Sequence, residues 1–142
     1  MQNNFDKFKM KQLQILFFLF FCHLSFSQFV KLSDKEINNS GASKINFIDN
    51  CNEATKLAEI DIKNKTIFLF LQSGAAPILY FGDKTFEEKY NIKFYEQGCI
   101  GSNCAKEYNE IIFDYLFKKY GKKWTKQIRK DVIGFKNWKK QP

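Results

Sequence analysis

The first 27 residues constrain the fold before any other feature, because they have the organisation of an export leader that is removed before folding. Three lysines lie within residues 1–12, residues 13–24 are almost wholly apolar, and serine begins and ends the stretch 25–27. Twelve residues of helix rise about 18 Å, well short of the roughly 30 Å hydrocarbon core of a bilayer. We therefore expect a signal peptide over 1–27, cleaved before Gln28; the alternative is an uncleaved N-terminal anchor.

Cleavage would leave 115 residues, a length typical of one domain, and would remove His23, the only histidine. Without an imidazole, Ser–His and Cys–His nucleophilic mechanisms are excluded in their usual form, and so are zinc sites with histidine ligands. No later apolar run is long enough to span a membrane. We expect an exported chain, periplasmic or secreted, with no transmembrane segment, cofactor or metal.

Positive charge is concentrated near the C-terminus. The formal net charge is +8, and ten basic residues but only one acid, Asp131, lie between Lys118 and Lys140. Arg129 is the only arginine, so the planar fork that favours specific phosphate or carboxylate recognition is scarce. We expect no nucleic-acid partner. The residues that we expect to contact a diffuse anionic surface are Lys122, Lys123, Lys126 and Lys130; the alternative is a merely solvated helix face.

The first half of the exported chain combines a polar lead-in with a helix and an apolar strand. We expect residues 28–48 to be flexible and residues 50–60 to form a helix begun by Asn50. Residues 66–72 are nearly all apolar, a pattern typical of a strand buried on both faces. A shorter strand is predicted at 78–81.

A helix, a strand and a longer helix follow. A capping box between Thr85 and Glu88 predicts a helix over 85–90, ending in a left-handed residue at Asn91, and the alternation over 92–97 predicts a strand near a sheet edge. Residues 105–120 form the longest predicted helix. Gly121 interrupts it, and a second piece follows with Trp124, Ile128, Val132 and Phe135 on one side.

The fold class predicted from these elements is α+β or small α/β, with helices packed on a sheet of two to four strands and a long C-terminal helix. The single compact domain is expected over 49–136, followed by a basic tail over 137–142.

Three cysteines would survive cleavage, and in an oxidising compartment they tend to pair. Cys99 and Cys104 bracket a short turn, so we expect a disulfide between them, because proximity along the chain favours it. A bond using Cys51, or no bond, remains the alternative. A redox enzyme would usually show C-x-x-C at a helix start, whereas the spacing here is C-x4-C.

Several short motifs resemble the FEKKY-domain family of small exported proteins from Bacteroidetes-type bacteria. They are "FEEKY" at 86–90, "GC" at 98–99, "YNEIIFDYL" at 108–116 and "KYGKKW" at 119–124. The resemblance covers roughly residues 50–135. It implies export and a compact domain, and it transfers no catalytic residue, because the family has no established activity.

The sequence therefore favours an exported, non-catalytic domain that binds an envelope protein or an anionic envelope component, with no catalytic residue assigned. A second hypothesis is an extracytoplasmic enzyme that uses carboxylates, with Asp83, Glu87, Glu88 and Glu96 as candidates that show no pairing by spacing. A third is a thiol redox protein.

Overall fold

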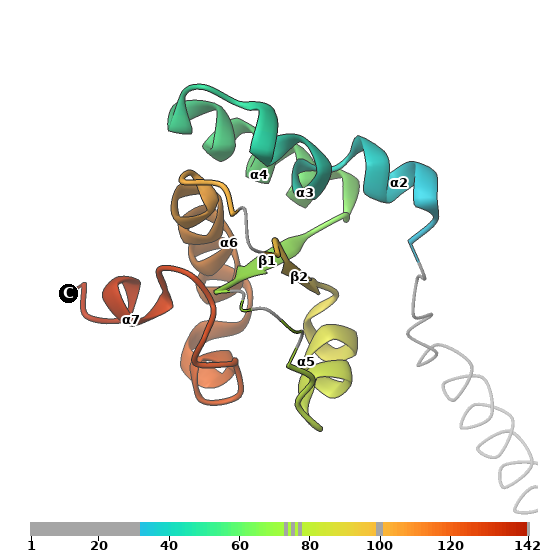
Figure 1. Ribbon diagram of the computed structural model, residues 1–142. Helices are drawn as coiled ribbons and strands as arrows, with labels where there is room; N and C mark the ends of the chain where they lie inside the picture. Colours follow the sequence, from blue (N-terminus) through green and yellow to red (C-terminus); the bar gives the residue numbers. More distant parts are fainter. Residues whose placement is uncertain (1–31, 73, 75, 77, 99–100, 142) are drawn as a thin grey trace, which may run out of the picture. The chain divides into compact units, whose positions relative to one another are not determined.

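The computed structural model describes residues 32–72, 74, 76, 78–98 and 101–141; the expected leader lies outside them. These residues form a small α+β fold, as predicted (Figure 1). The elements are, in order, α2 (Asp34–Asn39), α3 (Gly41–Lys44), η2 (Ile45–Phe47), α4 (Cys51–Asn64), β1 (Phe68–Leu71), α5 (Asp83–Tyr90), β2 (Lys93–Glu96), α6 (Ala105–Tyr120), η3 (Gly121–Lys126) and α7 (Phe135–Trp138).

The sheet consists, within the described residues, of two parallel strands. Phe68 of β1 lies opposite Lys93 of β2, and Leu71 lies opposite Glu96. All four residues of β1 are buried, as the apolar run predicted, whereas β2 is half-buried. The segment 131–133 runs antiparallel along the other edge of β1, where the Ile133 amide donates to the Phe70 carbonyl at 3.0 Å. β1 is therefore enclosed on both edges.

The prediction of a strand at 78–81 is wrong. Its backbone amides donate to side chains instead of a neighbouring strand: Ile78 to Glu96 at 3.2 Å and Tyr80 to Asp83 at 2.9 Å. All four of its large apolar side chains are exposed. Hydrophobicity alone suggested a strand, but this run folds as an exposed turn leading into α5.

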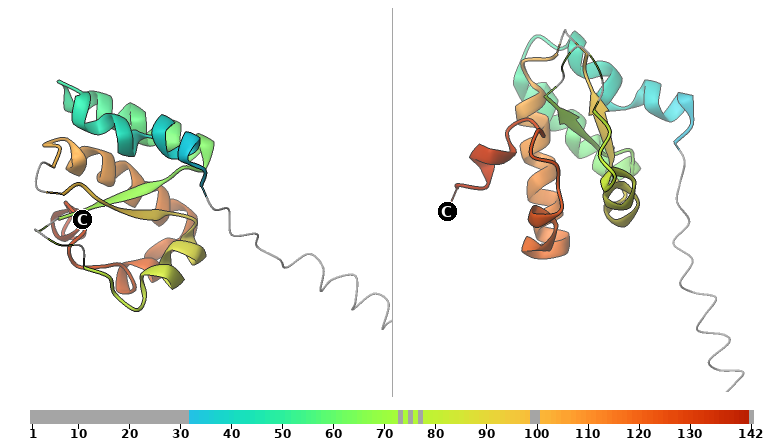
Figure 2. Two further views of the ribbon diagram at one scale, coloured as in Figure 1. Left: turned by 45° about the vertical axis from the view of Figure 1, so that its right-hand side comes forward. Right: turned by 60° about the horizontal axis from the view of Figure 1, so that its bottom comes forward.

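Helix α6 crosses β1 and packs beside α4 (Figure 2). Its predicted apolar stripe is confirmed, with Tyr108, Ile112 and Leu116 fully buried. The second piece after Gly121 is helical only as far as Lys126, in the 3-10 helix η3, and Val132 lies in the antiparallel segment beside β1; its four apolar residues are buried, as predicted. An aromatic cluster forms where α6, η3 and α7 meet, and it contains Phe113, Trp124, Phe135 and Trp138. Because Trp138 belongs to this cluster, the compact unit extends past the expected boundary at 136 into the expected basic tail.

The expected flexible lead-in is largely helical where the structure describes it. Ser33 caps α2 in a capping box with Glu36, and Ala42 and Ile45 are buried in the core. Gly41 sits so close to α4 and α6 that a Cβ there would lie 2.6 Å from the Tyr108 ring and 2.7 Å from the Asp61 carboxylate. The polar composition of 28–48 gave no sign of these contacts, which join the described part of the segment to α4 and α6.

Two predicted helix ends need correction. α5 begins at Asp83 with Gly82 as its cap and no side-chain capping bond, so the capping box of Thr85 and Glu88 is not formed. Its C-terminal end is as predicted, because Asn91 has φ 51°. α4 begins after Asn50, as predicted, but it runs on to Asn64, and Lys65 takes the left-handed conformation.

The disulfide joins Cys51 to Cys104, with a Cα–Cα distance of 4.8 Å. The expected pair of Cys99 and Cys104 is therefore wrong, and Cys99 itself lies outside the described residues. Sequence proximity favoured the short ring, but packing of α4 against α6 brings their N-terminal ends together. The bond links these two helices where each begins.

We expect removal of this bond in a Cys51→Ser/Cys104→Ser variant to lower the free energy of unfolding by about 4 kcal/mol, because it closes a long loop in the unfolded chain. Urea denaturation measures the loss. A Cys99→Ser variant is the matched control and should keep wild-type stability. A comparable loss in this control would indicate that Cys104 pairs with Cys99 instead.

Asn109 of α6 completes the hydrogen bonding of β1. Its side chain is fully buried, accepts the Phe70 amide at 2.9 Å, and donates to the carbonyls of Phe70 and Ile133, both at 2.9 Å. One side chain thus bonds to both β1 and the antiparallel segment. A buried backbone amide without a partner costs about 1–3 kcal/mol.

We expect Asn109→Ala to lower the free energy of unfolding by about 3 kcal/mol, since it leaves the Phe70 amide without its acceptor. Exposed Asn52→Ala, the control, should change stability by less than about 0.5 kcal/mol. Urea titrations of both variants provide the comparison. Equal stability of the two variants would contradict this role for Asn109.

Candidate functional site

The four lysines predicted to meet an anionic surface lie on one exposed part of the chain. Lys122, Lys123 and Lys126 belong to η3, and Lys130 follows shortly after. All four are exposed, whereas Trp124 and Ile128 between them are buried against the core. The alternation of buried and exposed residues fits a solvated face as well as a binding face, so the lysines alone do not decide between these readings.

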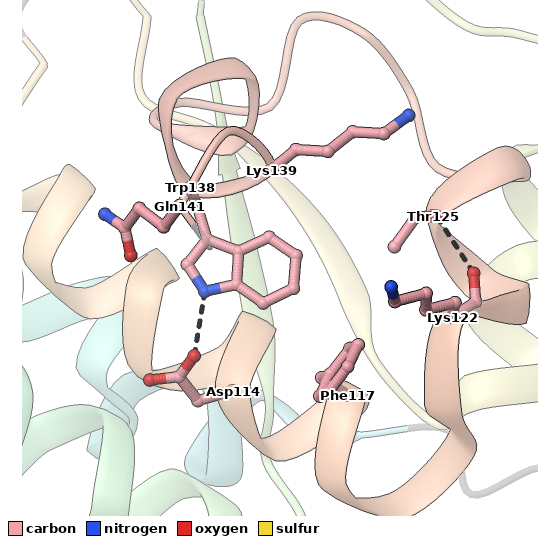
Figure 3. Close-up of a pocket in the computed structure, with 7 residues that line it drawn as sticks. All are labelled: Asp114, Phe117, Lys122, Thr125, Trp138, Lys139 and Gln141. Atoms are coloured by element: carbon pink, nitrogen blue, oxygen red, sulfur yellow. Dashed lines mark hydrogen bonds between the residues drawn. The ribbon is translucent and has the colours of Figure 1, made fainter.

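A pocket of about 380 Å³ adjoins this segment and gives it a more specific geometry (Figure 3). Three elements build its walls. The lining residues are Asp114, Phe117, Lys122, Thr125, Trp138, Lys139 and Gln141. One expected lysine, Lys122, thus belongs to the pocket, whereas the other three lie outside its lining.

The indole of Trp138 forms the main apolar wall of the pocket. Its Nε1–H donates to Asp114 at 2.8 Å, and its ring packs on Trp124 with centroids 5.4 Å apart. Phe117, which is 42% exposed, lies across from it with centroids 6.1 Å apart. A side chain held on one edge by a carboxylate and on one face by the core presents its ring in a fixed orientation.

Charged groups surround this aromatic wall. In Figure 3 the Lys122 ammonium points from η3 toward the Trp138 ring, whereas Lys139 points away to the rim. Asp114 lies on the opposite side of the indole from Lys122. An aromatic face, a cation and a carboxylate acceptor in one pocket suit a ligand that combines a weakly polar flat face, hydroxyl groups and a negative charge.

Sequence reasoning missed Trp138, because it lies in what was taken as a basic tail. The sequence did offer one sign of its role, a tryptophan next to lysines near the C-terminus. A tryptophan side chain in such a segment usually packs against the core or contacts a ligand. Asp114 was missed as well, because its position on α6 gives no sign that it faces α7.

A second hollow, of about 500 Å³, brings together three of the four carboxylates considered as catalytic candidates. Asp83, Glu87 and Glu96 line it with Arg129, near the C-terminal ends of β1 and β2. Glu88 is outside this lining and pairs with Lys84 at 3.9 Å. The spacing along the chain had not suggested this grouping, which arises because the turn at 78–82 folds back beside β2.

Each of these three carboxylates is bound to donors within the protein. Asp83 accepts the Arg129 guanidinium at 2.9 Å, Glu87 accepts the Phe94 amide at 2.9 Å, and Glu96 accepts the Ile78 amide. The hydrogen bond from Arg129 also lowers the pKa of Asp131. These contacts join the turn at 78–82, β2 and Arg129 to one another.

The thiol redox hypothesis requires an accessible reactive cysteine. Cys104, the cysteine near the start of α6, is 5% exposed and bonded to Cys51. Among the described residues, no group of three or more His, Cys, Asp or Glu side chains is placed to hold a metal ion. In the same part of the chain, no helix has the length and apolar character needed to cross a membrane.

A buried polar cluster centred on Asp61 lies outside the pocket lining. Asp61 of α4 is 1% exposed and accepts three hydrogen bonds: from the Gly41 amide at 2.7 Å, the Tyr108 hydroxyl at 2.7 Å and the Thr66 hydroxyl at 3.1 Å. Burial nevertheless raises the pKa of Asp61 above its ordinary value of 3.8. Burial beside Asp61 also raises the pKa of Tyr108 well above 10.0. The cluster joins α3, α4 and α6.

The raised pKa of Asp61 predicts a pH effect on stability. A carboxyl group with a higher pKa in the folded chain binds its proton more tightly there than in the unfolded chain. Its contribution to the free energy of unfolding is therefore full below about pH 3.8 and falls as pH rises through the raised pKa. We expect the stability of the wild type relative to Asp61→Asn to be greatest in acid and to decline toward neutral pH. Denaturant titrations of both proteins across this range test it; a difference that grows with pH would contradict the direction.

Comparison with protein-family models found no match, and searches of curated proteins and of solved structures found none either. The resemblance to the FEKKY-domain family therefore stays a prediction.

Proposed function

We propose that this protein is an exported, non-catalytic binding domain for an acidic sugar component of the cell envelope. The sugar would bind in the pocket lined by Trp138, Asp114 and Lys122, which we call the Trp138 pocket. The observation that carries the proposal is the fixed indole of Trp138 facing the Lys122 ammonium across a pocket of about 380 Å³. The C–H face of a sugar ring packs on an aromatic face, its hydroxyl groups donate to a carboxylate such as Asp114, and its acidic group pairs with a lysine.

The surrounding charge supports an anionic ligand. Lys139 lies at the rim, and Lys123, Lys126 and Lys130 are exposed on the adjoining segment. Long-range electrostatic attraction would bring a negatively charged polysaccharide to this face, and one of its sugar units would then bind in the pocket. The Asp114 carboxylate in the pocket repels a densely charged anion. A sugar with one acidic group therefore fits the pocket better than a polyphosphate.

The test is calorimetric titration with oligogalacturonate, with neutral malto-oligosaccharides of the same length as the control ligand. We expect oligogalacturonate to bind and the neutral sugars to bind much more weakly. Lys122→Gln should reduce affinity by about tenfold to a hundredfold, because one charge-assisted hydrogen bond contributes about 1.5–3 kcal/mol.

Lys136→Gln is the matched control, because Lys136 is exposed on α7 but does not line the pocket. It should retain nearly wild-type affinity. Glucose 1-phosphate, as a second ligand, shows whether the acidic group must be a carboxylate. Equal losses for the two lysine variants would mean that binding depends on diffuse charge alone, and the pocket assignment would then be rejected.

A further inference from the structure

The turn Ile78–Phe81, "ILYF", presents four consecutive large apolar side chains to solvent. Leu79 is 88% exposed, Phe81 is fully exposed, and Ile78 and Tyr80 are both more than half exposed. Single exposed apolar residues are ordinary on protein surfaces, but a contiguous group of this size usually marks an interaction site. The Trp138 pocket does not include this turn, so the proposed function leaves it unexplained.

The base of the turn is anchored by Arg129, which is only 8% exposed. Its guanidinium donates to Asp83 at 2.9 Å and makes two bonds to Asp131, at 3.0 and 2.6 Å. The Tyr80 ring lies over the same guanidinium, 4.7 Å away, and the Tyr80 amide donates to Asp83. Such a base fixes the backbone of the turn, so that little ordering is needed when Leu79 and Phe81 become buried against a partner.

Exposed lysines lie close to this turn. Lys84, whose side chain is 82% exposed, lines the same hollow as Leu79 and Tyr80. Lys89 bonds to Gln127 at 3.0 Å, which places the chain just after η3 beside α5 and with it the exposed Lys126 and Lys130. Figures 1 and 2 show α5 and η3 at the same end of the molecule.

Acidic side chains beside the turn are bonded within the protein: Glu88 pairs with Lys84 at 3.9 Å, and Glu96 accepts the Ile78 amide at 3.2 Å. Asp83 and Asp131 pair with Arg129, and Glu87 pairs with Lys93 at 3.3 Å. The turn thus combines a projecting apolar tip with exposed lysines nearby. That combination complements an anionic bilayer, where apolar and aromatic side chains enter the interface and lysines meet the headgroup phosphates.

We propose that Ile78–Phe81 inserts into the interface of an anionic lipid bilayer and that Lys84, Lys126 and Lys130 contact its headgroups. Charge complementarity favours a lipid surface over a protein groove, because a headgroup layer supplies negative charge on every side of an inserted tip. The turn lies outside the lining of the Trp138 pocket, and the two proposals share only the exposed Lys126 and Lys130. Substitutions in the turn and substitution of Lys122 therefore test them separately.

Co-sedimentation of the purified protein with vesicles tests this proposal. Vesicles of phosphatidylglycerol and phosphatidylcholine in equal parts should bind the protein, and vesicles of phosphatidylcholine alone should bind it much less. Leu79→Ser/Phe81→Ser should weaken binding about tenfold or more, because two large apolar side chains no longer leave water. Both positions are exposed, so the variant should fold normally, which circular dichroism verifies.

Phe47→Ser is the matched control, because Phe47 is 86% exposed on η2, away from the turn. It should bind anionic vesicles like the wild type. A Phe81→Trp variant supplies a second measurement: after subtraction of the wild-type signal, its added emission should shift to the blue on anionic vesicles and become protected from iodide.

Two results would overturn the proposal. One is wild-type binding by Leu79→Ser/Phe81→Ser, and the other is an unshifted, iodide-accessible signal from Phe81→Trp on vesicles that have bound the protein. Either result would indicate that the turn binds in an apolar groove of a partner protein instead.

Discussion

The fold depends on how the buried strand β1 satisfies its backbone hydrogen bonds. In a parallel pair, alternate amides of a strand point toward its partner, and the others point away. The amides of Phe68 and Phe70 point away from β2 and are met by side chains of α6, the Tyr108 hydroxyl at 3.4 Å and the Asn109 carbonyl oxygen at 2.9 Å. Tyr108 in turn donates to Asp61 of α4. In a sheet of only two strands within the described residues, β1 can therefore be buried completely, because polar side chains of a helix replace part of the missing strand.

Residue periodicity predicted the helix α4, the strands β1 and β2 and the helices α5 and α6, but it missed the helices of the lead-in and failed where contacts are long-range. The strand at 66–72 and the helix at 105–120 were predicted because their patterns are strong and local. The disulfide partner of Cys104 depends on the packing of α4 on α6, and Asn109 gives no local sign of its role, since asparagine in a helix is usually exposed. The run 78–81 was misassigned because apolar composition does not show whether a segment finds a partner strand.

The candidate site shows the same division. Lys122 was identified from charge, which sequence reports directly, but Trp138 and Asp114 become a site only when α7 folds back on α6. That return depends on the aromatic cluster, in which Phe113 contacts Trp124, Phe135 and Trp138 at centroid distances between 5.4 and 5.9 Å. A C-terminal segment rich in lysine would not fold by its own propensity, so packing of its aromatic residues determines where its charges are displayed.

The only arginine in the chain has a role that lysine could not fill. Arg129 binds Asp131 through two nitrogens and Asp83 through a third, while the rings of Tyr80 and Phe94 lie over its guanidinium at 4.7 and 5.5 Å. A planar group with five donors can pair with two carboxylates and stack on aromatic faces at the same time, whereas an ammonium group cannot stack in this way. Lys126 and Lys130, which lie close to Arg129 in the sequence, are exposed. Arg129 therefore has a structural role, because it connects the turn at 78–81 to the segment at 131–133. The exposed lysines give the surface around it positive charge.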